Sequence, residues 1–475
     1  MDNVLIDNIR LEVNKSLNSY NKSQYGQFMT PSVIADFMAN LFDDNALNVK
    51  LLDCGAGIGS LSISAIKKLK NILFADLWEV DPIMQGQLEI NMHLMNIKFS
   101  IYAKDFIFDA VENILSTGGE RYTHAIINPP YKKINSSSEH RKNLRKVGIE
   151  TVNLYSAFLA LTIMLMEENG QIIAIIPRSF CNGPYYKPFR EILLKECSIE
   201  HIHIFKSRNK AFKDDDVLQE NIIIKIRKGG PQSHVVISQS NDHEFNDYKE
   251  KQVQFSDVVK PSDAESFIHI PIEKKQYSEI LFQVSLLELG LSVSTGPVVD
   301  FRMKPYLEQQ LTDDSAPLLY PHHFVNGKLQ YPKEHKKPNA IKVSTETQKW
   351  LMPNEGYYVI VKRFSAKEEK KRVVAYIVNP NEIKGEWIGF ENHWNVFHIK
   401  KHGFDKEAAM GLACFLNSTI LDDYFRVFSG HTQVNATDLK NMRYPSLKIL
   451  RELGKSYQAK MSQEQVDILL AGVIN

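Results

Sequence analysis

Short runs of β-branched residues alternate with helical apolar patterns between residues 49 and 227. Apolar residues at helical spacing predict helices at Gly59–Lys70, Ile83–Met95, Val152–Glu168 and Lys187–Glu196. The β-branched runs predict seven strands, at Val49–Asp53, Leu73–Glu79, Ile97–Ala103, Thr123–Ile127, Gln171–Ile176, His201–Phe205 and Asn221–Ile226. This alternation is typical of an α/β domain in which helices cover both faces of a parallel sheet. The last two strands leave no room for a helical crossover, so we expect them to form an antiparallel pair.

The sequence changes character after the seventh predicted strand. Lys228–Ser233 combines glycine, proline and polar residues and predicts a linker, so we expect domains at residues 1–232 and 233–475. The second domain carries strand-like runs and helical stretches, at Gly356–Lys362, Arg372–Val378, Lys406–Phe415 and Ala436–Met442. We therefore expect a mixed α/β domain, and no catalytic constellation or internal repeat is evident in its sequence.

The composition narrows the class of protein. The chain has 475 residues, 43% of them hydrophobic and 24% charged, which is typical of a globular protein with two domains. No apolar stretch is long enough to span a bilayer and the first residues lack a signal-peptide core, so we expect a cytoplasmic protein. The cysteines have no ligand-like spacing, so neither a metal site nor a disulfide framework is expected. A net charge of +1 argues against a uniformly basic surface and leaves room for local basic clusters, as at Lys132–Lys146 and Lys362–Arg372.

A glycine-rich turn joins the first predicted strand to a helix. Gly55, Gly57 and Gly59 form a G-x-G-x-G pattern, whereas a dinucleotide fingerprint would require glycine or alanine at position 60, which is Ser60. Such a turn lets a ligand approach the backbone closely at the start of a helix. It favours a nucleoside ligand without a pyrophosphate, and a purely structural turn is the alternative.

Acidic residues follow the next two predicted strands. Glu79 ends the second strand, where a carboxylate can accept hydrogen bonds from ribose hydroxyls. Asp105 and Phe106 close the third strand, where they could accept from an adenine amino group and stack on its ring. Taken singly, Asp105 is more often a helix cap and Phe106 a core aromatic. Their spacing after the glycine turn favours a nucleoside site.

The tetrapeptide Asn128-Pro129-Pro130-Tyr131 follows the fourth predicted strand, at the sheet edge where open α/β proteins bind ligands. The two prolines restrict the backbone and leave their carbonyls free to accept hydrogen bonds. The loop therefore presents an amide, a carbonyl and an aromatic ring, which suits an amino group on a flat ring. An ordinary loop is the alternative for an isolated tetrapeptide of this kind.

Together these residues resemble the gamma-class S-adenosylmethionine-dependent N6-adenine DNA methyltransferases of type II restriction–modification systems, the group of the TaqI and PstI modification enzymes. Tyr25–Pro31 is similar to the family's amino-terminal cofactor segment, and Asn128–Tyr131 to its catalytic tetrapeptide. Asn153–Phe158 and Gly170–Pro177 resemble the helix and strand that follow. Further similar stretches in the second half, Val361–Glu368 and Ser429–Ala436, resemble segments of target-recognition domains.

The resemblance implies S-adenosyl-L-methionine as cofactor, double-stranded DNA as partner and methyl transfer to a flipped-out adenine. Asn128 and Pro129 would accept the amine hydrogens, and Tyr131 and Phe212 would stack on the target base, although the loop after Phe212 is unusually acidic. The implied catalytic residues are Asn128, Pro129, Pro130, Tyr131 and Phe212. The implied cofactor-binding residues are Tyr25, Gln27, Thr30, Pro31, Asp53, Gly55, Gly57, Gly59, Glu79, Asp105, Phe106 and Asn128. We expect a monomer with a Rossmann-like methyltransferase domain, and the sequence leaves open whether a separate cognate endonuclease is its partner.

Other interpretations of the function stay open. Methyltransferases that act on a protein glutamine amide also use Asn-Pro-Pro-Tyr, but they resemble short chains with a helical domain before the glycine turn, whereas here the extra domain follows it. An RNA amine is another possible substrate. A DNA-binding protein with an inactive methyltransferase fold is disfavoured by the intact turn and tetrapeptide, and a fused endonuclease by the lack of a surplus domain.

Overall fold

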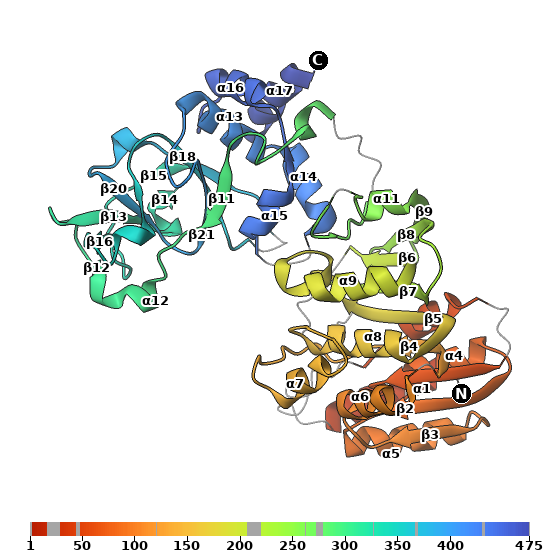
Figure 1. Ribbon diagram of the computed structural model, residues 1–475. Coiled ribbons are helices and arrows are strands. Elements are labelled where there is room, and N and C mark those ends of the chain that lie inside the picture. The colour runs from red at the N-terminus through yellow and green to blue at the C-terminus, as the bar shows by residue number, and fades with distance from the viewer. Residues whose placement is uncertain are drawn as a thin grey trace. The chain divides into compact units, whose positions relative to one another are not determined.

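The computed structural model describes residues 2–16, 29–43, 48–119, 121–206, 220–261, 263–271, 279–325, 327–365, 369–429 and 433–474. The chain divides into two compact units, Met1–Glu273 and Lys274–Asn475, which are coloured red to green and green to blue in Figure 1. Within the described ranges, no helix is long and apolar enough to cross a membrane.

The first unit is built on a nine-stranded sheet in the order β3-β2-β1-β4-β5-β7-β6-β8-β9. Strands β1 to β5 run parallel, and β7 lies antiparallel between β5 and β6, which confirms the predicted antiparallel pair. The predicted Rossmann-like α/β class is therefore confirmed, with two strands more than the seven expected. The strands are β1 Val49–Cys54, β2 Ile72–Trp78, β3 Phe99–Tyr102, β4 Tyr122–Ile127, β5 Met166–Pro177, β6 Cys197–Phe205, β7 Asn221–Lys228, β8 His234–Ser240 and β9 Lys249–Gln254.

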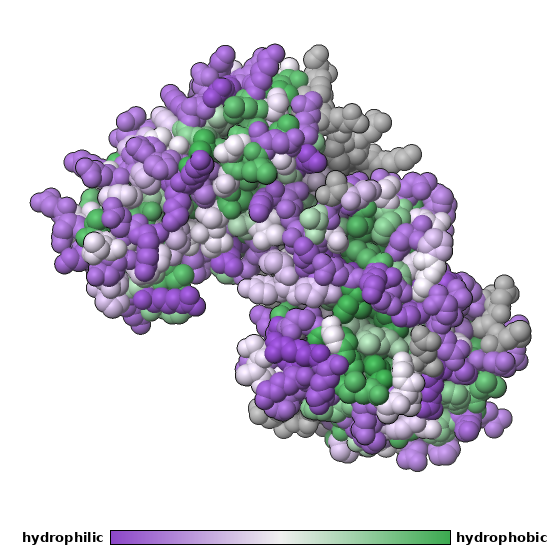
Figure 2. Space-filling model, viewed as in Figure 1, coloured by the Kyte–Doolittle hydropathy of each residue, from purple (hydrophilic) through white to green (hydrophobic). Residues whose placement is uncertain are grey.

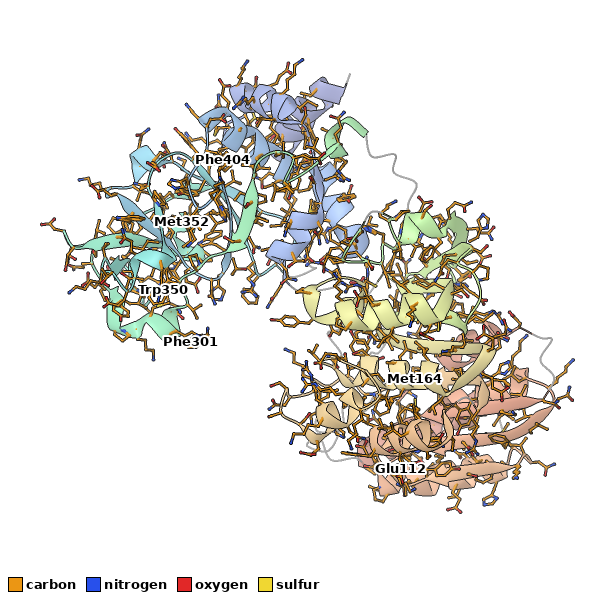
Figure 3. All side chains as sticks on the ribbon, in the orientation of Figure 1. Glu112, Met164, Phe301, Trp350, Met352 and Phe404 are labelled. Atoms are coloured by element: carbon orange, nitrogen blue, oxygen red, sulfur yellow. The ribbon has the colours of Figure 1, made fainter. Side chains whose placement is uncertain are left out.

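Helices cover both faces of this sheet, because alternate strand residues are apolar on both sides. On one face, Ile126 and Ile173 share a core with α3, α4 and α5. On the other face, Ala125 and Ile172 share a core with α6, α8 and α9, and Figure 3 labels Glu112 on α6 and Met164 on α8. The helices are α1 Asn3–Ser16, α3 Ser32–Asn40, α4 Ser60–Lys68, α5 Pro82–His93, α6 Phe106–Thr117, α7 Glu139–Arg145, α8 Leu154–Leu165, α9 Lys187–Glu196 and α11 Phe255–Val258.

The boundary predicted at residue 232 is wrong, because the sheet continues beyond it. Strand β8 pairs in parallel with β6, and β9 pairs antiparallel with β8. The Gly229-Gly230 turn, in which both glycines have positive φ, therefore leads from one strand of the sheet to the next. The two units divide about forty residues later, at Glu273.

The second unit combines a four-stranded antiparallel sheet and a five-stranded mixed sheet with carboxy-terminal helices. Its sheets have the orders β11-β21-β18-β19 and β12-β16-β13-β20-β17, and two strand pairs, β10-β22 and β14-β15, accompany them. The predicted strands and helices in this half are confirmed as β18, β19, α13 and α15. The strands are β10 Val284–Ser285, β11 Ser292–Thr295, β12 Leu307–Glu308, β13 Ser315–Leu319, β14 Phe324–Val325, β15 Lys328–Leu329, β16 Ala340–Lys342, β17 Leu351–Pro353, β18 Tyr358–Lys362, β19 Ala375–Val378, β20 Trp387–Phe390, β21 Trp394–His398 and β22 Arg443–Tyr444. The helices are α12 Asp300–Met303, α13 Lys406–Leu416, α14 Thr419–Phe428, α15 Ala436–Asn441, α16 Leu447–Ser456 and α17 Gln463–Ile474.

Candidate functional site

A cavity of about 470 Å³ lies at the carboxyl edge of the first unit's parallel strands. Its wall includes residues that directly follow β1, β2 and β4 and the first residue of α6. Its volume is within the range of small-molecule sites. Eight of the predicted site residues line it, namely Thr30, Gly55, Gly57, Glu79, Asp105, Phe106, Asn128 and Pro130.

The glycine turn after β1 is closed against β2 by its own amide groups. The amides of Gly55 and Ala56 both donate to the Trp78 carbonyl, at 2.9 Å each. The amide of Gly57 donates to the Glu79 carboxylate, also at 2.9 Å. Gly55 and Gly57 have φ angles of 87° and 58°, which favour glycine. Since these three amides already have acceptors, the turn does not present them to a phosphate, and this supports the predicted nucleoside ligand without a pyrophosphate.

Glu79 lies at the end of β2, in the cavity wall. Its two oxygens accept from the amides of Gly57 and Asp81, at 2.9 and 2.8 Å. Burial raises the pKa of this carboxyl, although the backbone donors oppose the shift. The two backbone bonds fix the orientation of the carboxylate in the cavity wall.

Asp53 lies on β1, outside the cavity wall. The side chain is fully buried, and one oxygen accepts from the Ser62 hydroxyl at 2.6 Å. The other oxygen has no hydrogen-bond partner among the described residues. Burial raises the pKa of Asp53 to about 7, and the nearby Glu79 carboxylate adds to the shift. Asp53 therefore links β1 to α4 and does not line the cavity.

Asp105 and Phe106 line the cavity and also have the structural roles that each residue suggests alone. Asp105 caps α6, because its Oδ1 accepts from the amides of Ile107 and Phe108. Its Oδ2 lies 2.8 Å from Nε2 of His140. Phe106 is only 2% exposed and packs at an angle against Trp78 and Phe158, with ring centroids 5.5 and 5.0 Å away.

Asn128 links the tetrapeptide to the chain's amino-terminal segment. Its amide nitrogen donates to the Thr30 hydroxyl, and its Oδ1 accepts from the Tyr131 hydroxyl, both at 2.9 Å. Thr30 precedes α3 and is buried. The amide group of Asn128 is therefore held from both ends at the cavity wall.

Tyr131 has a different position from the one expected. Its side chain is 9% exposed in the core cluster that includes α8, it packs edge-on against Tyr155, and it is absent from the cavity wall. Its hydroxyl also lies 3.1 Å from the Ile175 carbonyl. Burial raises the pKa of Tyr131 well above its usual range, so the phenol keeps its proton. In this conformation Tyr131 positions Asn128 through its hydroxyl.

The other predicted site residues fall into two groups. Those that are described but lie outside the cavity wall are Pro31, Asp53, Gly59, Pro129 and Tyr131. Those that lie outside the described residues are Tyr25, Gln27 and Phe212.

Several wall residues were not predicted. Trp78 lies directly before Glu79 and stacks on Tyr102, and this position beside a predicted site residue was a usable signal. Phe158 belongs to the apolar helix α8, where it is indistinguishable from core residues in the sequence. His140 is on the short helix α7, 35 residues after its partner Asp105. No sequence pattern connects these two residues.

The basic cluster after the tetrapeptide is partly neutralised by carboxylates. Arg141 and Arg145 both bind Glu150, and the Lys142 amine lies 2.7 Å from Glu139. Figure 2 shows a strongly hydrophilic surface over α7, which carries these charges. Lys132 and Lys133 precede the helix, are exposed and line the cavity, so they are better candidates for contact with an anionic partner.

The fold and the cavity define a Rossmann-like methyltransferase, and comparisons with known proteins identify the family. A model of the Eco57I restriction-modification methylase family matches residues 60–212. The chain is 50% identical to the type II methyltransferase M.BsuBI of Bacillus subtilis, over 95% of this chain and 93% of that protein. It is 39% identical to the type II methyltransferase M.PstI of Providencia stuartii, over 98% of this chain and 96% of that protein. The chain therefore belongs to the type II methyltransferases of restriction–modification systems.

A likeness to a solved structure supports the fold alone. The cryo-EM structure of the DrdV–DNA complex matches with a TM-score of 0.51 at 11% identity, over 93% of this chain and 58% of that chain.

Proposed function

We propose that this protein is a site-specific DNA methyltransferase that transfers a methyl group from S-adenosyl-L-methionine to N6 of a flipped-out adenine. The observation that carries the proposal is one cavity lined by Glu79, Asp105 and Asn128. These side chains follow three different strands at one sheet edge, so they can contact the ribose, the adenine and the reacting methyl group of one extended cofactor.

The wall residues suit the parts of S-adenosylmethionine. The Glu79 carboxylate lies in the cavity wall after β2, where it suits ribose hydroxyls, and Oδ2 of Asp105 has an acceptor position for the adenine amine. Phe106 and Trp78 provide the apolar surface that a purine needs. When bound, the cofactor supplies an electrophilic methyl group on a positively charged sulfur.

Asn128 acts on the target amine. The nitrogen of an exocyclic adenine amine is a poor nucleophile, because its lone pair is delocalised into the ring. Acceptors that bind its hydrogens favour a tetrahedral nitrogen whose lone pair is available. The Asn128 oxygen and the Pro129 carbonyl have this role, which is electrostatic preorganisation. The bonds of Asn128 to Thr30 and Tyr131 keep the amide in place before the substrate arrives.

Stacking of the target base is the part of the proposal that requires movement. The buried Tyr131 ring must leave its edge-on contact with Tyr155 if it is to stack on the extruded adenine. Stacking would offset part of the few kcal/mol that base extrusion costs. Phe212, which lies outside the described residues, is proposed for the opposite face of the base.

The unit Lys274–Asn475 is proposed to recognise the target sequence. The two stretches that resemble target-recognition segments meet in this unit: Phe364 bridges Gln433, and the Val434 amide donates to the Arg363 carbonyl at 2.7 Å. Phe364 is 48% exposed and packs against His393, with ring centroids 5.0 Å apart. This contact supports a single surface built from both stretches.

The reaction and its specificity can be tested together. The gene is expressed in a host that lacks DNA methylation, and the host DNA is sequenced by a single-molecule method that detects modified bases. We expect N6-methyladenine in one short sequence context. Modified cytosine, or no modified base despite cofactor binding, would refute the proposal, and the latter result would direct the search to protein amides or RNA.

The role of Asn128 can be tested in the purified protein. Asn128→Ala should lower kcat by roughly 100-fold or more, which is typical for loss of one group that stabilises a transition state. The Kd for S-adenosylmethionine should change by no more than a few fold. Asn113→Ala, on α6 and outside the cavity wall, is the matched control. Near-normal kcat in Asn128→Ala would contradict the mechanism.

A further inference from the structure

His140 makes a contact that the proposed mechanism does not use. It lies on α7, and its Nε2 is 2.8 Å from Oδ2 of Asp105, which precedes α6. Both residues line the cavity. The imidazole also packs at an angle against Phe108, with ring centroids 5.2 Å apart. The contact therefore fixes the segment after the catalytic tetrapeptide to the part of the cavity assigned to adenine.

The donors around Asp105 restrict its carboxylate to one orientation. Oδ1 accepts from the amides of Ile107 and Phe108, at 2.9 and 3.4 Å, and Oδ2 accepts from His140. A carboxylate oxygen has two acceptor positions, so Oδ2 keeps one for a ligand. The side chain of Asp105 is 41% exposed, which leaves it accessible from the cavity. Without His140, the helix cap alone would hold the carboxylate.

Charge supports the geometry. The His140 hydrogen bond lowers the pKa of Asp105, although burial opposes this effect, and the same bond raises the pKa of His140. An ionised carboxylate only accepts hydrogen bonds, so Nε2 must carry the hydrogen. Lys132 is the other charged group that acts on His140, and it opposes protonation. On α7 itself, Glu139 and Arg141 are bound to Lys142 and Glu150.

We propose that His140 is a positioning residue for cofactor recognition. It donates to Oδ2 of Asp105 and thereby directs the remaining acceptor position of that oxygen to the exocyclic amine of the cofactor's adenine. This inference rests on the proposed function, because it takes an adenine nucleoside as the ligand. It extends that function, because His140 on α7 would increase the preference for a purine ring that carries an amino group over one that carries a carbonyl group.

The test compares binding of S-adenosylhomocysteine and S-inosylhomocysteine, which carries a carbonyl in place of the adenine amine. Calorimetry on the full-length protein gives the ratio of the two Kd values. We expect the wild type to prefer S-adenosylhomocysteine, and His140→Ala and His140→Asn to reduce this preference by about threefold to tenfold, because the bond to a charged acceptor is lost. His140→Gln, whose amide nitrogen reaches the same position, should restore the preference to within about twofold of wild type.

A pH series provides a second readout that a purely structural role would not change. A protonated His140 offsets the negative charge of Asp105 and so weakens the hydrogen bond of that carboxylate to a ligand. The wild-type affinity for S-adenosylhomocysteine should therefore rise with pH as the imidazole loses its proton. The affinity of His140→Gln should lack this dependence. The control is His93→Gln, an exposed histidine on α5 outside the cavity wall, which should behave as wild type.

The outcomes separate the two proposals. If the wild type binds neither nucleoside, the cofactor assignment fails and this inference fails with it. If the wild type binds S-adenosylhomocysteine preferentially, and His140→Ala and His140→Asn keep the full preference with an unchanged thermal midpoint, the role of His140 is refuted while the cofactor assignment stands.

Discussion

The glycine turn allows a test that separates backbone strain from loss of the binding surface. Gly55 and Gly118 have nearly equal φ angles, 87° and 82°, in the region that L-residues rarely adopt. Alanine at either position should cost about 1–2 kcal/mol of folding free energy. The two positions differ in their surroundings. A Cβ at Gly55 would lie 3.8 Å from the Asn128 carbonyl at the cavity wall, whereas a Cβ at Gly118 would meet nothing within 4 Å.

The expected magnitudes follow from these contacts. The thermal midpoints of both variants should fall by a similar amount, about 2–4 °C for each kcal/mol in a domain of this size. Only Gly55→Ala puts a methyl group on the surface that a ligand approaches. If overpacking there costs about 1–3 kcal/mol, the Kd for S-adenosylmethionine should rise by about 5- to 150-fold. Gly118→Ala should bind as tightly as wild type, since Gly118 ends α6 outside the cavity wall.

Differential scanning calorimetry and isothermal titration calorimetry measure the two effects on the same samples. Gly59→Ala completes the series, because its Cβ would lie 2.8 Å from Leu88 Cδ1, so it should destabilise the fold by more than the other two. Equal affinities in Gly55→Ala and Gly118→Ala would refute the reasoning, because the glycine turn would then have a structural role alone.

Two further predictions concern charge. Substituting alanine for both Lys132 and Lys133 should lower the slope of log Kd for DNA against log salt by about 2. The control Lys142→Ala removes a lysine paired with Glu139 and should change the slope less. Equal slopes in the double variant and the wild type would exclude a phosphate contact. Asp53 has a folded pKa of about 7, above its value of 3.8 in the unfolded chain, so the folded state binds more protons between these pH values and stability falls as pH rises through them. Chemical denaturation measures the free energy of unfolding at pH 5 and pH 8. Between these values the wild type should lose about 2–3 kcal/mol more than Asp53→Asn, and an equal loss in the two proteins would contradict a buried, protonatable Asp53.

The central sheet was predictable because its buried strands are rich in β-branched residues and its crossover helices have apolar periodicity. Strand β9 was missed because its sequence, Lys249–Gln254, is mostly charged and polar, as suits an exposed edge strand that only β8 pairs. Strand β8 was missed because glycine and proline before it are as typical of a linker as of a turn within a sheet. Local sequence does not distinguish these cases, since β8 joins the sheet by pairing with β6, which is distant in the sequence.

The location of a site residue was predictable where that residue directly follows a parallel strand. Glu79, Asp105 and Asn128 each follow a parallel strand, so they had to meet at one edge. The direction of a side chain is not decided in this way. Tyr131 follows the same strand as Asn128, yet its ring turns into the core, where Tyr155 packs against it and its hydroxyl lies 3.1 Å from the Ile175 carbonyl. These contacts depend on tertiary packing that no local pattern encodes.

Asp105 shows why a polar residue can both cap a helix and bind a ligand. A helix cap and a ligand acceptor are alternatives only if one atom must do both, and a carboxylate has two oxygens with about four acceptor positions. At Asp105 the cap uses Oδ1, while Oδ2 accepts from His140 and keeps one position for a ligand. The cap also helps the recognition, because two backbone amides fix the carboxylate before any ligand binds and so reduce the entropy that binding must remove. A polar residue at a helix start beside a cavity is therefore a better candidate for a binding role than its frequency as a cap suggests.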